Sequence, residues 1–183
     1  MKTINIYTDG ACSGNQNETN IGGWGAILEY GNHIKEMHGG EKNTTNNKME
    51  LSALCEALAA LKEKGLKVNV FSDSSYLVNC FKEQWYIKWQ KNGWMTSAKA
   101  AVENREIWEK LIALMDGQEM QFYLVKGHVN PASEWGPKMK AAYMKFIDHN
   151  GPFSLEDFKY IIEKNNRADA LANIFIDENR RAD

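Results

Sequence analysis

Four acidic residues stand where a folded chain rarely places a charge. Asp9 and Asp73 each end an apolar run typical of a β-strand, and Glu50 shares a predicted helix face with the apolar residues three, four, seven and eleven positions further on. Asp169 is expected in the first turn of the last helix, whose apolar residues face inward. Because side chains from neighbouring parallel strands meet at the carboxyl edge of a sheet, these carboxylates are candidates for one shared site.

Such a site has a recognisable chemistry. Buried carboxylates destabilise a fold unless their charge is cancelled, and four of them together would repel one another and raise their pKa values. A hard divalent cation prefers oxygen ligands, and two such ions about 4 Å apart suit an in-line displacement at phosphorus. The alternative is that each residue is a separate helix cap or turn aspartate, since periodicity does not show that the four meet.

The elements that must position these residues follow from the spacing of apolar side chains. The expected strands cover residues 3–8, 24–29, 33–38, 68–72 and 120–125, with a turn-rich loop at 11–23. The expected helices before residue 130 cover 48–62, a helical stretch at 74–94, and 102–115. Strands that alternate with helices after an initial meander predict an α/β fold, with a mixed five-stranded sheet flanked by helices.

The segment 130–164 has a helical period of its own. Apolar residues recur on one face from Met139 to Ile147, after a proline start at Pro137, and Ser154 is placed to cap a second helix. A last helix is expected at about 166–179. The chain is therefore predicted to be a single catalytic domain, residues 1–183, with an inserted helical pair.

The composition limits the binding partners and the cellular compartment that fit this sequence. The 183 residues carry a net charge of −2, so any site for a polyanion must be a local patch. Three cysteines without CxxC spacing favour free thiols in a reducing compartment. Residues 1–10 lack the apolar core of a signal peptide, and the apolar runs are too short to span a membrane, so we expect a soluble, cytoplasmic, monomeric protein.

Five motifs, in order along the chain, resemble those of bacterial-type ribonuclease HI. One motif alone would be weak, whereas five interleaved with the expected strands and helices are specific. The resemblance runs from residue 1 to 129 and resumes from 165 to about 176. The motifs are YTDGACSGN at 7–15, TNNKMEL at 45–51, SDS at 72–74, VKGH at 125–128 and NNRAD at 165–169.

This resemblance implies an endonuclease that cleaves the RNA strand of RNA–DNA hybrids, leaving 5′-phosphate and 3′-hydroxyl ends. Asp9, Glu50, Asp73 and Asp169 match the four metal-binding carboxylates, which implies two Mg²⁺ ions, with Mn²⁺ as a possible substitute. His128 matches a loop histidine that assists proton transfer or product release, and its ordinary pKa suits that role. Without the resemblance, a lone histidine after a strand is more often a solvated loop residue.

Contacts to the hybrid are expected on a local basic segment. Four lysines against one glutamate give residues 82–99 a charge of +3, and tryptophans interleave with them, resembling the basic protrusion of the family. The resemblance implies nucleic-acid contacts at Asn15, Thr45, Asn46, Trp85, Lys88, Trp89, Lys91, Trp94 and Lys99. Two alternatives stay open: the tryptophans could anchor a helix to the core, and Thr45 and Asn46 could be plain helix caps.

The main departure from the family lies between His128 and Asp169, which are 41 positions apart, where relatives use about ten residues. Charges within the insert balance, so we expect a packed structural elaboration; alternatively it restrains the histidine loop or contacts substrate. Two rival functions remain: a DNA nuclease of the same fold, and a catalytically silent hybrid-binding module. The four carboxylates argue against the second.

Overall fold

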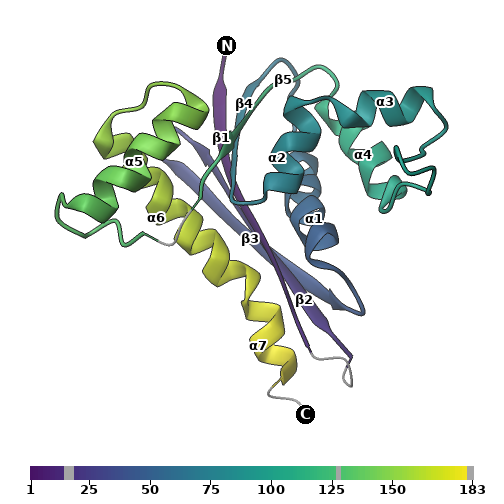
Figure 1. The fold of residues 1–183 in the computed structure, drawn as a ribbon, viewed down its shortest axis with the longest axis horizontal. Coiled ribbons are helices and arrows are strands. Elements are labelled where there is room, and N and C mark those ends of the chain that lie inside the picture. The colour runs from purple at the N-terminus through teal and green to yellow at the C-terminus, as the bar shows by residue number, and fades with distance from the viewer. Residues whose placement is uncertain (15–18, 127–128, 181–183) are drawn as a thin grey trace.

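The computed structural model describes residues 1–14, 19–126 and 129–180. Its centre is a five-stranded sheet in the order β3-β2-β1-β4-β5 (Figure 1). β1 pairs antiparallel with β2 and β2 with β3, whereas β1, β4 and β5 run parallel, which confirms the predicted mixed sheet. The strands are β1 (Thr3–Ser13), β2 (Ile21–Tyr30), β3 (His33–Lys42), β4 (Lys67–Ser72) and β5 (Glu119–Leu124).

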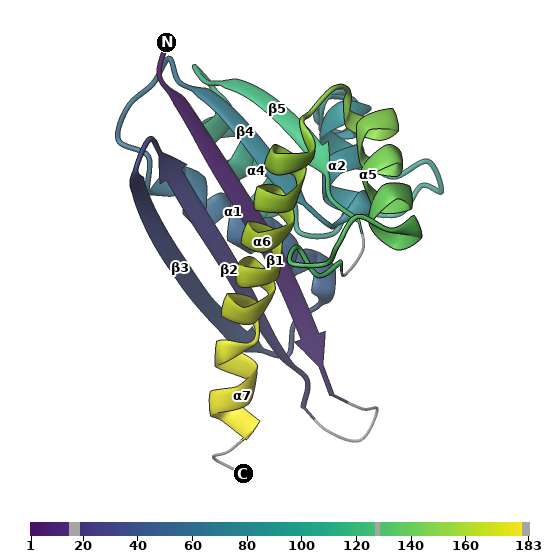
Figure 2. The same cartoon turned by 90° about the vertical axis from the view of Figure 1, so that its left-hand side faces the viewer.

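Helices cover both faces of the sheet. In Figure 2, α6 (Leu155–Ala172) crosses the near face, while α1 (Asn46–Ala59) and α4 (Arg105–Met115) lie behind the strands. Alternation along β1 explains the two layers, because Ile6 faces the core under α1 and Tyr7 faces the core under α6. The remaining helices are α2 (Ser75–Lys82), α3 (Trp85–Lys91), α5 (Pro137–Asn150) and α7 (Ile174–Arg180).

The first strand is longer than its sequence predicts. The expected loop at 11–23 is wrong at both ends, since β1 continues to Ser13, which pairs with Ile21. Pairing of β1 with β4 stops at Thr8 and Ser72, but the antiparallel partner β2 extends the strand further. Asp9 therefore lies within β1, at the end of its parallel ladder, rather than at the end of the strand.

The helical stretch expected at 74–94 is two helices. α2 ends at Lys82, Gln84 adopts a left-handed conformation with φ of 57°, and α3 begins at Trp85. Aromatic rings attach this segment to the body of the protein: the ring centroids of Trp89 and Trp108 are 5.4 Å apart, and Trp108 is fully buried.

The predicted boundary before the last helix is also wrong. Ser154 caps α6 as expected, accepting a hydrogen bond from the Asp157 amide at 3.1 Å, but the helix then runs without a break to Ala172. No glycine or proline interrupts 155–172, so nothing ends the helix near residue 165. Asp169 consequently lies in the last turns of an 18-residue helix instead of in a first turn.

The segment 130–164 packs on the sheet as part of the same body. The Phe71 ring stacks between Tyr7 and Tyr123, with centroids 5.1 and 5.0 Å away, and Phe153 meets Phe71 edge-on. Phe146 of α5 closes this aromatic layer. None of the helices in the described part of the chain is long and apolar enough to cross a membrane.

Candidate metal centre

Strand register brings the first two carboxylates together. Thr8 and Ser72 form the last pair of the parallel β1–β4 ladder, so Asp9 follows it within β1 and Asp73 is the first residue after β4. Ser74 then caps α2, accepting a hydrogen bond from the Leu77 amide at 3.1 Å, which turns the chain away immediately after Asp73. The expected meeting at the carboxyl edge of parallel strands is confirmed for this pair.

Helix α1 delivers the third carboxylate through a close approach to β1. A Cβ atom at Gly10 would lie 2.5 Å from the backbone nitrogen of Glu50, so only glycine lets the helix come this near. Glu50 is 2% exposed, as its place on the apolar helix face predicts.

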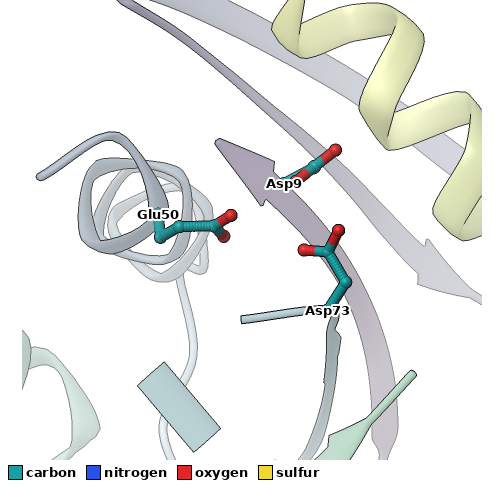
Figure 3. A group of neighbouring side chains, drawn as sticks. All are labelled: Asp9, Glu50 and Asp73. Atoms are coloured by element: carbon teal, nitrogen blue, oxygen red, sulfur yellow. The ribbon is translucent and has the colours of Figure 1, made fainter. Parts of the chain in front are cut away.

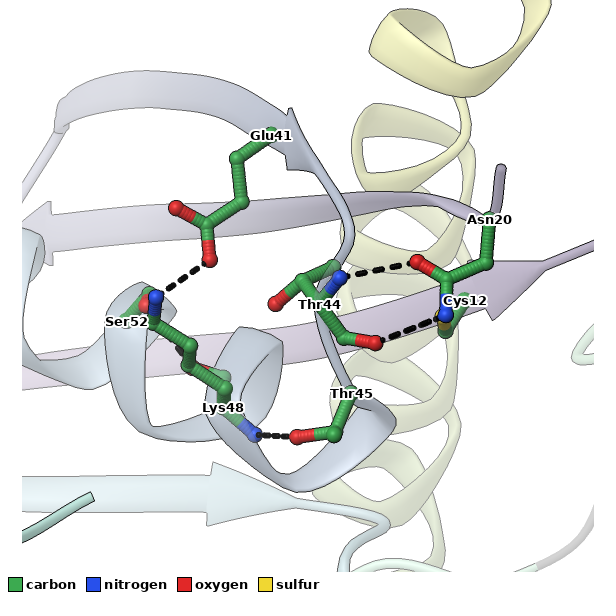
Figure 4. A network of polar contacts seen from close by, with 7 residues as sticks. All are labelled: Cys12, Asn20, Glu41, Thr44, Thr45, Lys48 and Ser52. Atoms are coloured by element: carbon green, nitrogen blue, oxygen red, sulfur yellow. Dashed lines mark hydrogen bonds and ion pairs between the residues drawn. The ribbon is translucent and has the colours of Figure 1, made fainter.

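A polar network fixes the start of α1 (Figure 4). The Asn20 side chain accepts from the Thr44 amide at 2.8 Å and donates to the Thr44 carbonyl at 3.0 Å, and Lys48 pairs with Glu41 of β3 at 2.7 Å. Thr45 caps the helix, since its hydroxyl accepts a hydrogen bond from the Lys48 amide at 3.1 Å. These contacts hold the helix that carries Glu50 in place.

The three carboxylates point toward one another (Figure 3). One oxygen atom from each of Asp9, Glu50 and Asp73 lies within 4.8 Å of one oxygen atom from each of the other two. Asp9 is 3% exposed and also accepts a hydrogen bond from the Gly10 amide at 2.8 Å. Separate turn or cap roles do not explain why two buried acidic groups and a partly buried one converge.

Asp169 approaches this group from α6. An interaction with the Asp169 side chain contributes to the raised pKa of Asp9, and the charge of Asp169 contributes to the raised pKa of Glu50, although Asp169 lies outside the set of three that meet within 4.8 Å. A second glycine makes this approach possible, because a Cβ at Gly25 would lie 2.5 Å from the Ala168 carbonyl oxygen. The two glycines therefore let α1 and α6 pack closely against opposite faces of the sheet.

The electrostatics of the four carboxylates favour the binding of a positive charge. Burial raises the pKa of Asp9, and the charges of Glu50 and Asp73 raise it further. Burial, followed by the Asp73 charge, raises the pKa of Glu50 to about 8. The Glu50 Oε2 atom is buried without a hydrogen-bond partner in the described part of the protein. A divalent cation with oxygen ligands fits this donor set and would lower both pKa values.

The residues expected to contact nucleic acid are partly placed. Asn15 and His128 lie outside the described residues, so their predicted roles stay predictions. Thr45 and Asn46 are exposed at the start of α1. The cap geometry confirms the alternative interpretation for Thr45, and its contact to nucleic acid remains a prediction.

The basic protrusion combines anchoring rings with exposed cations. Trp94 is 7% exposed and packs in the core, whereas Trp85 and Trp89 are partly buried against it. The interpretation of the tryptophans as anchors is therefore supported. A hollow of about 430 Å³ nevertheless opens along Trp85, Lys88 and Trp89. Lys88, Lys91 and Lys99 are all exposed.

Sequence reasoning missed the residues that set the approach of the helices. Gly10 and Gly25 have no side chain to bind a metal or substrate, but each admits the backbone of a helix that carries a carboxylate. The sequence places Asn20 in a turn-rich loop and gives no sign of its hydrogen bonds to the Thr44 backbone. For Gly25 the only signal in the sequence is its position inside an expected strand, which often marks a close backbone approach; Gly10 lies beyond the expected first strand and has no such signal.

Comparison with known proteins assigns this geometry to a family. The RNase H family model matches residues 1–135, which include Asp9, Glu50 and Asp73. The chain belongs to the ribonuclease H family. Ribonuclease H of Acetivibrio thermocellus is 55% identical over 128 residues, covering 70% of this chain and 84% of that protein. Ribonuclease H of Chlorobium chlorochromatii is 52% identical over 131 residues, covering 72% and 87%.

Solved structures show the same architecture as this ribonuclease H. LC9-RNase H1, a type 1 RNase H with the type 2 active-site motif, is 26% identical with a TM-score of 0.62, covering 82% of this chain and 72% of that one. LC11-RNase H1, solved in complex with an RNA/DNA hybrid, is 20% identical with a TM-score of 0.55, covering 96% and 97%. The second likeness concerns the fold alone.

Proposed function

We propose that this ribonuclease H hydrolyses the RNA strand of RNA–DNA hybrids with two Mg²⁺ ions held by Asp9, Glu50, Asp73 and Asp169, with Mn²⁺ able to substitute. The observation that carries the proposal is the convergence of two buried carboxylates and one partly buried carboxylate within 4.8 Å, with Asp169 interacting with Asp9. Family membership supplies the hydrolytic activity and its dependence on a divalent metal.

The residues of the site act by holding charge and position. When bound, the ions supply positive charge beside the attacking water and the leaving oxygen, which lowers the barrier of an in-line displacement. Asp9, whose pKa is raised by burial and by all three other carboxylates, would hold metal together with them. The water oxygen forms a bond to phosphorus while the bond to the 3′ oxygen breaks, leaving a 5′-phosphate and a 3′-hydroxyl. His128 is proposed to assist the accompanying proton transfer.

We propose that the basic protrusion, residues 82–99, and the start of α1 bind the substrate. Lys88, Lys91 and Lys99 would neutralise phosphates, and the hollow beside Trp85 and Trp89 could take a sugar face. Asn46 is exposed and would hydrogen-bond a ribose 2′-hydroxyl, which both donates and accepts.

The decisive experiment is a panel of end-labelled hybrid, duplex DNA and duplex RNA, each incubated with and without Mg²⁺. The proposal expects cleavage of the RNA strand of the hybrid alone, only with metal, and products that carry a 5′-phosphate. Cleavage of duplex DNA would instead support a DNA nuclease. Binding of the hybrid without cleavage in Mg²⁺ or Mn²⁺ would support a silent binding module.

We also propose that residues 1–183 form one catalytic domain with an insert at about 130–164, acting as a cytoplasmic monomer. The shared aromatic layer supports the single domain, because Phe71 of β4 and Phe146 of α5 belong to one core. Unpaired Cys12, Cys55 and Cys80 suit a reducing compartment. Size-exclusion chromatography with light scattering would test the monomer.

A further inference from the structure

A hollow separate from the three converging carboxylates opens where the edge strand β5 ends. It has a volume of about 240 Å³ and lies between α2 and α5, which flank β5 from its two sides (Figure 1). Leu124 at the end of β5, together with Ala142 and Phe146 of α5, gives it an apolar wall. Polar groups form the rest of its lining.

Three cationic or protonatable side chains surround this hollow. Lys126 follows β5, while Lys145 and His149 stand four residues apart on one face of α5. Ser75 and Asn79, also four residues apart, add a hydroxyl and an amide from α2. None of the eight lining residues is acidic. The lining therefore suits an anion that also has an apolar or sugar surface.

The hollow is held open by a specific contact between α5 and the sheet. Asn150, the last residue of α5, accepts a hydrogen bond from the Leu124 amide at 3.0 Å and donates to the Leu124 carbonyl at 2.8 Å. Its amide thus takes the place of a missing neighbouring strand at the edge of β5. Phe146, one turn earlier, is buried in the aromatic layer. These two anchors fix the face of α5 that presents Lys145 and His149.

The hollow also lies close to the metal centre. Ser75 is two residues after Asp73, so their Cα atoms are at most about 7.6 Å apart. Val125, just before Lys126, donates a hydrogen bond from its amide to the Ser72 carbonyl at 2.8 Å. The hollow is therefore within reach of a nucleic-acid strand bound at the carboxylates.

We propose that the hollow between α2 and α5 binds a sugar–phosphate unit of the hybrid backbone, a few nucleotides from the scissile phosphate. The inference rests on the proposed function and gives the insert a role in substrate binding. Lys145, His149 and Lys126 would contact the phosphate, and the sugar would lie against Leu124 and Ala142. Phosphate and sugar take most hydrogen bonds between proteins and nucleic acids, and an apolar wall strengthens a nearby charge interaction.

The test measures the Kd of a labelled hybrid over a range of salt concentrations, with every variant carrying Asp9→Asn so that the hybrid stays intact. The double variant Lys145→Ala/His149→Ala should raise Kd about tenfold and reduce the slope of log Kd against log salt concentration by about one. The matched control is Lys140→Ala, an exposed lysine of α5 that does not line the hollow, which should leave the slope unchanged.

Single methylphosphonates, placed in turn along each strand, locate the contact because each removes one phosphate charge. A methylphosphonate at one internal position should weaken binding of the hybrid by the reference protein, which carries Asp9→Asn alone. The same methylphosphonate should not weaken binding by the double variant. Equal slopes for the double variant and Lys140→Ala, or no such position, would overturn the inference while leaving the nuclease assignment intact. Loss of hybrid binding by the reference protein itself would overturn the proposed function. Lys145→Gln/His149→Gln repeats the test should the alanine pair fail to fold.

Discussion

Asp9 stands at the centre of the chemistry because it is close to all three other carboxylates. Burial raises the pKa of Asp9, and interactions with Glu50, Asp73 and Asp169 raise it further. A buried carboxylate among other carboxylates does little to stabilise the fold, but it contributes strongly to the binding of a cation. A substitution that keeps its shape and removes its charge should therefore separate catalysis from binding.

We expect Asp9→Asn to reduce cleavage of the hybrid by at least about 100- to 1,000-fold, because it removes a metal ligand. The Kd for the hybrid should stay within about threefold, since the protrusion is unchanged. Single-turnover cleavage and fluorescence anisotropy measure the two quantities. The control is Asp177→Asn, an exposed carboxylate of α7. Cleavage within tenfold of the unmodified protein would contradict the assigned role.

The same carboxylates predict how stability changes with pH when no metal is present. The pKa of Glu50 rises to about 8 in the folded state from about 4.3 in the unfolded state, and the pKa of Asp9 also rises. The folded state therefore binds protons more tightly, so this contribution to stability is complete below pH 4 and is lost as the pH rises toward 8.

In EDTA, the unfolding free energy of the unmodified protein should fall relative to that of Asp9→Asn as the pH rises from 5 to 8. Millimolar Mg²⁺ should remove most of that difference, because the cation binds the ionised form. Urea denaturation at three pH values, with and without Mg²⁺, gives the comparison. A difference that is independent of both pH and metal would show that the carboxylates are not electrostatically strained.

At the scale of elements, the positions of α1 and α6 depend on glycines in the strands beneath them. Gly25→Ala places a Cβ 2.5 Å from the Ala168 carbonyl and 2.7 Å from the Leu171 Cβ, so α6 must move away from β2. We expect a loss of about 1–3 kcal/mol in unfolding free energy and a lower kcat, since Asp169 moves with the helix.

Gly136→Ala is the control, because a Cβ there meets nothing closer than 3.9 Å. Thermal unfolding and steady-state kinetics measure the two effects. A Gly25→Ala protein with unchanged kcat would show that the position of Asp169 does not limit turnover.

The elements also show what could be predicted from the sequence. The spacing of apolar residues and the order of strands and helices predicted the mixed sheet. The place of Glu50 on an apolar helix face predicted its burial. Both predictions depend only on residues near one another in the sequence. The end of β1 could not be predicted, since its partner β2 extends it. The turn at Gln84 could not be predicted either, because no glycine or proline marks it. The full length of α6 was likewise not predicted, because its sequence contains no glycine or proline to show where a boundary would lie. The close approaches at Gly10 and Gly25 depend on tertiary packing.

At the scale of the whole molecule, the segment 130–164 is part of the core. Phe146 is 4% exposed, and its ring lies 5.1 Å from Phe153 and 5.0 Å from Phe158. Phe153 in turn meets Phe71 of β4 edge-on. The segment that lines the proposed phosphate site therefore also protects the sheet that carries Asp73.

Phe146→Ala should lower the unfolding free energy of the whole protein by about 3–5 kcal/mol, because it leaves a cavity in the shared aromatic layer. Met144→Ala, on the exposed side of the same helix, should change it by less than about 0.5 kcal/mol. Urea unfolding followed by both fluorescence and circular dichroism should show one transition for each protein, since a single core unfolds as a unit. An early separate transition in Phe146→Ala would mean instead that α5 folds independently of the catalytic sheet.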